Sequence, residues 1–228
     1  MTTVQDKAQS SELNQQNKQQ LWKFWQQLES AEGAELAAAA TNSMSATMQW
    51  HGFAPLDSLS GPDQFLGKFW KPFRAAFSNP TRKSHMFFGG ISFGREDGQG
   101  DDGMWVGGTG YFHGVFAHDW LGIPAHGKAV SIRWGELCQL EDGLVTQVYV
   151  LLDLVDLLQQ VGFNVLPPAR GKDGLYPPPR NDDAIYLQAQ DPVESQRTMD
   201  LIRSFIFESL NVYDQEDLQS MGVADHFP

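Results

Sequence analysis

Residues 104–162 have the sequence MWVGGTGYFHGVFAHDWLGIPAHGKAVSIRWGELCQLEDGLVTQVYVLLDLVDLLQQVG. Three runs in this stretch, 104–116, 128–140 and 144–152, are rich in β-branched and aromatic residues, which favour strands. Because no helical pattern separates them, we expect the three strands to follow one another in an antiparallel sheet. This stretch decides the fold class.

The link between the second and third of these strands is Glu141-Asp142-Gly143. An Asp-Gly pair between two apolar runs is among the strongest short-range signals for a hairpin. Residues 154–161 then predict a short apolar helix, which Gly162 ends. Asp153 lies where the sheet ends and this helix begins, and the pattern makes it our candidate for the chemical centre.

Upstream of the stretch, the apolar spacing is helical. Leu21, Phe24, Trp25 and Leu28 mark one face of an amphipathic first helix that starts near Leu13. Further elements are expected in this order: a second helix at 32–41, a strand at 45–53, a third helix from Gly61-Pro62-Asp63, and a strand at 84–93. Helices that come early and strands that run consecutively predict an α+β domain, in which a curved antiparallel sheet wraps around the N-terminal helices.

The composition changes after Gly162. We expect a disordered tail at 1–10, one domain at 11–162, a proline-rich linker or arm at 163–193 and a helical segment at 194–228. The last segment, with a short helix at 213–221, is interpreted either as the opening of an incomplete second domain or as an arm that packs on a partner.

The chain has 228 residues and a formal net charge of −12. This excess of acid argues against a nucleic-acid surface, which needs clustered Lys and Arg, and gives no polybasic signal for a membrane. Cys138 is the single cysteine, so no intrachain disulfide is expected, and its place in a strand favours a small buried hydrophobe. The polar N-terminus and the lack of a long apolar run predict a cytoplasmic protein.

Several short motifs occur together in a specific order. They are the G-x-x-x-G of Gly110 and Gly114, the L-G-I-P-x-x-G of 121–127, and the E-D-G-x-V hairpin at 141–145, followed by Asp153 and a helix ending Q-x-G. Over residues 13–162 the chain resembles the SnoaL-like polyketide cyclases of the nuclear-transport-factor-2-like superfamily.

The resemblance implies a cone-shaped fold, with a bent sheet and helices enclosing a hydrophobic pocket. It implies a homodimer formed through the outer face of the sheet. It also implies an intramolecular aldol ring closure with no metal and no organic cofactor, in which Asp153 is the general acid/base. The cyclases carry a His on the preceding strand, and this chain has Gln139 there instead.

Two further residues are predicted to act with Asp153. Tyr149 shares its strand parity, so it faces the pocket if Asp153 does, as a donor to a developing enolate oxygen. His113 lies on a predicted inner strand, where it either polarises a carbonyl or makes a hydrogen bond across the sheet. Asp153 with Asp156 also fits a helix N-cap, and the two roles are compatible.

The remaining candidates are expected to line the pocket. Glu136 interrupts an apolar strand face, so it is either paired in a buried network with an arginine or catalytic. Arg133 is the arginine we consider for a carboxylate–arginine pair. The predicted lining residues are Trp50, His51, Trp105, Tyr111, Arg133, Trp134 and Gln139.

The sequence therefore predicts a cofactor-free cyclase or isomerase that moves protons on a small apolar carbonyl substrate. Two alternatives stay open. One is a non-catalytic ligand-binding or dimerisation module with the same pocket, and the other is a dehydratase or epoxide hydrolase, which needs a carboxylate–arginine arrangement that activates water.

Overall fold

The computed structural model describes residues 4–93, 102–167, 174–180 and 184–212. The chain forms two units, Met1–Leu187 and Gln188–Pro228. The first unit contains one six-stranded sheet and the N-terminal helices, so the predicted α+β class is confirmed. None of the helices in these ranges has a stretch long and apolar enough to cross a membrane.

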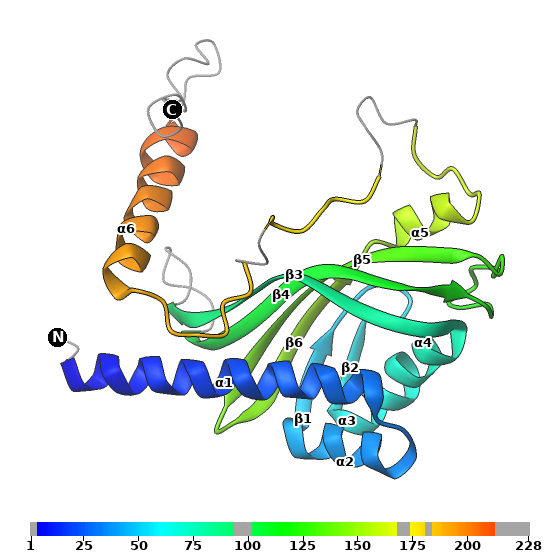
Figure 1. The fold of residues 1–228 in the computed structure, drawn as a ribbon, viewed down its shortest axis with the longest axis horizontal. Coiled ribbons are helices and arrows are strands. Elements are labelled where there is room, and N and C mark those ends of the chain that lie inside the picture. The colour runs from blue at the N-terminus through cyan, green and yellow to red at the C-terminus, as the bar shows by residue number, and fades with distance from the viewer. Residues whose placement is uncertain (1–3, 94–101, 168–173, 181–183, 213–228) are drawn as a thin grey trace. The chain divides into compact units, whose positions relative to one another are not determined.

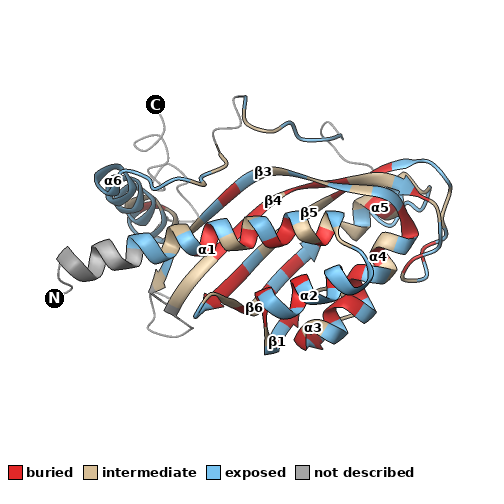
Figure 2. Cartoon of the chain, turned by 60° about the horizontal axis from the view of Figure 1, so that its bottom comes forward, coloured by how far each residue is buried: buried red, intermediate tan, exposed pale blue. Residues whose placement is uncertain are grey.

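Helix α1 (Val4–Ser30) crosses the inner face of the sheet, and α2 (Gly33–Ser43) follows it (Figure 1). The predicted apolar stripe of α1 is buried against the strands, as the red bands in Figure 2 show. Because α1 begins at Val4, residues 4–10 belong to a helix and not to the tail that the polar composition predicted.

The strands are β1 (Met44–His51), β2 (Ser58–Ser60), β3 (Phe77–Phe93), β4 (Asp102–Phe116), β5 (Ala129–Glu141) and β6 (Leu144–Leu152). Their order is β2-β1-β6-β5-β4-β3, and every pair is antiparallel except β1 with β6. The predicted hairpin joins β5 to β6: Glu141 pairs with Leu144, and Asp142 and Gly143 both have positive φ, as a tight two-residue turn requires.

The predicted third helix is made of α3 (Gly61–Gln64), a π-helical turn η1 (Phe65–Trp70) and α4 (Lys71–Ala76). Strand β3 starts directly after it, at Phe77 and not at Ser84 as the sequence suggested. Pro80 therefore lies within this strand. It is tolerated because β3 is an edge strand whose register shifts between Ser78 and Thr81, so the missing N–H costs no ladder bond.

The sheet has an apolar inner face and a mixed outer face. On β5 the even-numbered residues point inward, and the buried ones are Val130, Ile132, Trp134, Cys138 and Leu140. The sequence did not decide which face of the sheet the helices cover. In the structure they cover the face that carries the even-numbered residues of β5. Cys138 is 1% exposed, so the expectation of a small buried hydrophobe is confirmed.

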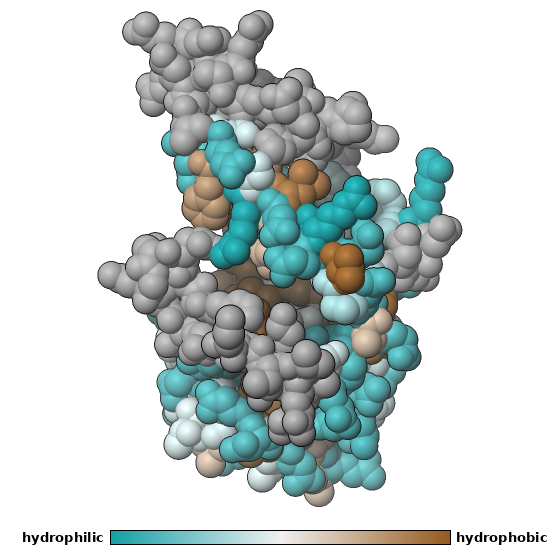
Figure 3. Space-filling view, turned by 90° about the vertical axis from the view of Figure 1, so that its left-hand side faces the viewer, coloured by the Kyte–Doolittle hydropathy of each residue, from teal (hydrophilic) through white to brown (hydrophobic). Residues whose placement is uncertain are grey.

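After β6 the chain forms α5 (Leu154–Gln160) and then the proline-containing arm, which returns to the free edge of β3. The second unit contains α6 (Pro192–Arg203), a π-helical turn η2 (Ser204–Ser209) and a 3₁₀ turn η3 (Leu210–Val212). The helix predicted at 213–221 and most of the 94–103 loop lie outside the described residues. The described surface in Figure 3 is largely hydrophilic, in keeping with the net charge.

Candidate functional site

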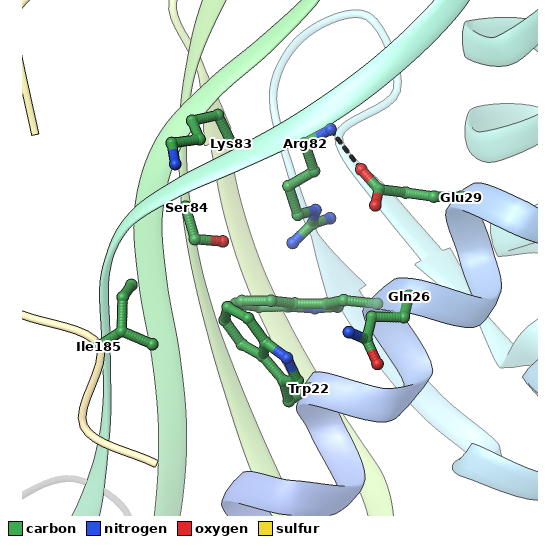
Figure 4. A pocket seen from close by; sticks show the side chains of 8 residues that line it. Trp22, Gln26, Glu29, Arg82, Lys83, Ser84 and Ile185 are labelled. Carbon is green, nitrogen blue, oxygen red and sulfur yellow. Dashed lines mark hydrogen bonds between the residues drawn. The ribbon is translucent and has the colours of Figure 1, made fainter. Parts of the chain in front are cut away.

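A cavity of about 390 Å³ lies between α1 and β3. Its lining comes from three separate parts of the chain, the last turns of α1, the middle of β3 and the returning arm (Figure 4). The lining residues are Trp22, Trp25, Gln26, Glu29, Arg82, Lys83, Ser84 and Ile185.

Arg82 is the charged group at the floor of this cavity. It pairs in register with Phe112 on β4, so its side chain points to the inner face, and that side chain is only 5% exposed. The guanidinium carbon lies 4.3 Å from the ring centroid of Trp25 and 4.5 Å from that of Trp134. Cation–π attraction to these rings offsets part of the cost of burying the charge.

The carboxylate of Glu136 forms an ion pair with this guanidinium. Its Oε2 lies 3.1 Å from Nη2 of Arg82, and its Oε1 accepts a 2.8 Å hydrogen bond from the indole N–H of Trp25. The interruption of the apolar face of β5 is therefore a buried ion pair, as one of the two sequence interpretations had it, with Arg82 as the arginine. The thiol of Cys138 also points at Glu136, and burial raises the pKa of that thiol.

Two nitrogens of Arg82, Nε and Nη1, are buried without a hydrogen-bond partner. An unsatisfied buried donor costs on the order of 1–3 kcal/mol, and aromatic rings compensate for it only in part. The fold therefore keeps a cation at the cavity floor with hydrogen-bonding capacity that the protein itself does not use.

Glu29 is the acidic group of the cavity. It lies in the last turns of α1, and its carboxylate accepts the backbone N–H of Arg82 (dashed line in Figure 4). Burial raises the pKa of Glu29, and the hydrogen bond and charge of Arg82 oppose that shift without cancelling it. A carboxyl whose pKa is moved toward neutrality exchanges protons more readily at working pH, which suits general acid/base chemistry.

The structure places Asp153 away from this cavity. It is the N-cap of α5, and its Oδ1 accepts the backbone N–H of Asp156 at 3.0 Å. Asp153 is half-buried and does not line the cavity. The capping role that the sequence allowed is therefore present, and within the part of the chain that the structure describes this carboxylate is not part of the cavity lining.

Tyr149 lies on the outer face of the sheet, which corrects the expectation that it faces the pocket. It is 45% exposed, its ring stacks on His51 at 4.5 Å, and Trp105 lies 5.9 Å away. The reason is the alternation along β6, where the buried residues are Val148, Val150 and Leu152. His51 and Trp105, predicted as pocket residues, lie with Tyr149 on this outer surface.

Tyr111, His113 and Arg133 also belong to the outer face, where the structure brings them together. The Nε of Arg133 donates to the hydroxyl of Tyr111 at 3.2 Å, and this bond raises the pKa of Arg133. His113 Nδ1 and Ser131 Oγ lie 2.8 Å apart, which is the cross-sheet hydrogen bond considered from the sequence. The arm covers the group, with the ring of Tyr176 4.5 Å from the Arg133 guanidinium.

The other predicted lining residues are buried structural groups. Trp50 is 1% exposed in the core and Gln139 is 4% exposed, and neither lines the cavity. Trp134, also 1% exposed, touches the site through its contact with Arg82. The rule that aromatic residues on strands pack in the core explains both tryptophans.

The sequence analysis missed Glu29 and Arg82. Two weak signals were present in the sequence. Glu29 follows Trp25 by one helical turn, so the two side chains share a face of the first helix. Arg82 precedes Ser84 by two residues, which puts both on one face of a strand, but the predicted strand started only at Ser84. Only the tertiary packing of α1 on β3 joins them.

The first unit is an α+β domain whose described residues include a cavity with a buried charged group at its floor. No protein-family model matches the chain, and no curated protein matches it in sequence. Among solved structures it is similar to a candidate SnoaL-like polyketide cyclase from Jannaschia sp. CCS1, at 16% identity and a TM-score of 0.47, over 67% of this chain and 94% of that one.

It is likewise similar to an NTF2-like protein from Burkholderia thailandensis E264, at 14% identity and a TM-score of 0.46, over 66% of this chain and 98% of that one. A candidate SnoaL-like polyketide cyclase from Shewanella putrefaciens CN-32 matches at 14% identity and a TM-score of 0.47, over 64% and 85%. The structural neighbours thus bear the family names to which the sequence pointed. Likeness at such identities does not transfer an activity, so the function is argued from the site.

Proposed function

We propose that the protein is a cofactor-free acid/base enzyme acting on a small apolar substrate that carries a carbonyl group, in the manner of a cyclase or isomerase. The observation that supports this is the content of one cavity: Glu29 and Arg82 both line it, and the guanidinium of Arg82 forms an ion pair with Glu136. Trp22 and Trp25 supply an aromatic wall for an apolar ligand.

The chemistry assigns one role to each group. Glu29 removes a proton from the carbon next to the carbonyl and returns it at another position, so an isomerisation or an intramolecular aldol closure needs no co-reactant. The positive charge of Arg82 stabilises the enolate oxygen as it forms, which is a large effect in a water-poor site. Glu136 is a positioning residue, because it touches Arg82 and not the cavity.

A dehydratase or epoxide hydrolase is the second candidate. Such enzymes need a carboxylate beside an arginine to activate water, and Glu29 and Arg82 both line the cavity, whereas Arg133 was the arginine considered from the sequence. A non-catalytic binding module would use the same cavity without proton transfer.

Deuterium wash-in tests the first of these possibilities. The protein is incubated in D₂O with aryl alkyl ketones and β,γ-unsaturated cyclic ketones, and loss of the α-proton signal is followed by NMR. We expect exchange or isomerisation of at least one class, reduced about 10²-fold or more in Glu29→Gln because general acid/base groups contribute that much. Glu12→Gln, an exposed change on the same helix, is the matched control. Binding without exchange in any class would contradict the proposed proton transfer.

We also propose a cytoplasmic homodimer that assembles through the outer sheet face, with no nucleic-acid partner. Exposed apolar side chains on that face support it, namely Met86, Phe88, Leu137, Tyr149 and Leu151. Leu137 and Tyr149 are direct cross-strand neighbours, so they form one patch. Sedimentation of Leu137→Glu should show monomers where the wild type shows dimers, and a monomeric wild type would contradict the proposal.

A further inference from the structure

The arm contributes a wall to the cavity. Ile185 is one of the lining residues, although the others belong to α1 and β3. It is held there by a short backbone ladder: the Phe87 N–H donates to the Ala184 carbonyl at 2.8 Å, and the Tyr186 N–H donates to the Phe87 carbonyl at 2.7 Å. Residues 184–187 therefore lie along the free edge of β3 beside Phe87, as Figure 4 shows for Ile185.

A lysine from α1 fastens the same segment. Lys18 is 2% exposed, and its Nζ donates a 2.6 Å hydrogen bond to the carbonyl of Tyr186. A charged donor makes a stronger hydrogen bond than a neutral one. Lys18 lies one helical turn before Trp22, so its hydrogen bond to Tyr186 is formed next to an aromatic residue that lines the cavity.

The described residues of the arm before Ala184 are mostly exposed. Leu166, Leu175 and Tyr176 are each more than half exposed, so these side chains bury little apolar surface, although Tyr176 contacts Arg133 and Tyr111. Segments with few buried contacts open at much lower free energy than the core of the same domain. The three hydrogen bonds to residues 184–187, together with the packing of Ile185 and Leu187 against the core, therefore hold this segment at the edge of β3.

We propose that residues 184–187 are a removable wall of the cavity, that Lys18 is the latch that keeps it closed, and that Ile185 limits the size of the ligand that fits. Ligand enters when the arm leaves the edge of β3 and is enclosed when it returns. The proposal rests on the proposed function only in that it takes this cavity as the substrate site.

The latch is tested by hydrogen exchange on the full chain. The amides of Phe87 and Tyr186 donate the two ladder bonds, so their exchange rates report the opening of this wall. We expect Lys18→Met, which keeps the buried stem and removes the donor, to speed both amides about tenfold, since a hydrogen bond from a charged group is lost. Lys23→Met is exposed on the same helix and should change neither. Unchanged exchange in Lys18→Met would overturn the latch.

The wall is tested with a neutral fluorescent dye, N-phenyl-1-naphthylamine. Ile185→Trp should fill the cavity and weaken dye binding about tenfold or more, and Ile185→Ala should widen it and admit bulkier dyes. Tyr186→Ala is the matched control, because it keeps the backbone carbonyl that Lys18 contacts. Dye affinity that is the same in all of these proteins would overturn the wall.

These outcomes are independent of the catalytic proposal. Glu29→Gln should bind the dye and exchange its amides as the wild type does, while it loses proton transfer. If the Lys18 and Ile185 variants change amide exchange and dye binding as predicted but no ketone reacts, only the catalytic proposal is refuted. If a ketone reacts but these variants exchange amides and bind dye as the wild type does, only the proposal about the wall is refuted.

Discussion

The carboxylate of Glu29 accepts the backbone N–H of Arg82, a residue 53 positions further along the chain. This contact ties the end of α1 to β3 beside the cavity. Because the donor is a backbone group, substitution of the Arg82 side chain leaves it in place. The two charges of the site can therefore be changed one at a time.

The first prediction concerns stability and pH. Glu29 has an ordinary pKa of 4.5, and burial raises it in the folded protein. The folded chain then binds more protons than the unfolded chain above pH 4.5, so the free energy of unfolding falls as the pH rises from 4.5 through the raised pKa. Urea unfolding of Glu29→Gln between pH 4 and 7 should show a smaller decline than the wild type. An equal decline would mean that Glu29 titrates normally.

The second prediction concerns the buried ion pair. Glu136→Gln should destabilise the protein by about 3–5 kcal/mol, because it leaves the Arg82 guanidinium buried without its counter-charge. The double variant Arg82→Met with Glu136→Leu should recover most of that loss, since both charges are then removed. Urea midpoints measure both, with exposed Glu141→Gln as the control. A double variant less stable than the single one would show that the pair stabilises the fold.

The third prediction concerns Asp153. Asp153→Ala should cost about 1 kcal/mol through loss of the α5 cap, and Asp153→Asn should cost little because Asn caps equally well. Neither should change the rate of ketone exchange by more than about twofold. A stable Asp153→Asn protein with a hundredfold loss of rate would restore the role that the family resemblance implied.

The fourth prediction concerns the chemistry of Arg82. Arg82→Lys keeps the charge but loses the planar group that lies over Trp25 and reaches Glu136. We expect the rate to fall about tenfold or more while dye binding stays intact, because Lys does not replace Arg at a stacked, hydrogen-bonded site. Dye titration and exchange kinetics on the same preparation check this. An unchanged rate would remove Arg82 from the mechanism.

Much of the fold was predictable because its signals are local. The helical spacing of Leu21, Phe24, Trp25 and Leu28 and the Asp142-Gly143 turn each act within a few residues, and both are confirmed. The π-helical turn at 65–70 and the parallel pairing of β1 with β6 have no such local signal.

The site was less predictable because it is built from distant segments. Parity showed that Glu136 interrupts an apolar face, but its partner Arg82 lies 54 positions earlier, ahead of the strand start predicted at Ser84. Parity alone also could not tell which face of β6 points inward, so Tyr149 was expected in the pocket. The choice between the two faces is made by the packing of α1, which one strand does not encode.

The most direct test of the account is the rate of proton exchange in Glu29→Gln against that in Asp153→Asn, measured on one ketone substrate in D₂O. The account predicts that Glu29→Gln loses about a hundredfold or more of the rate and that Asp153→Asn keeps nearly all of it. The opposite order, with Asp153→Asn inactive and Glu29→Gln active, would contradict the assignment of the catalytic site to the cavity between α1 and β3.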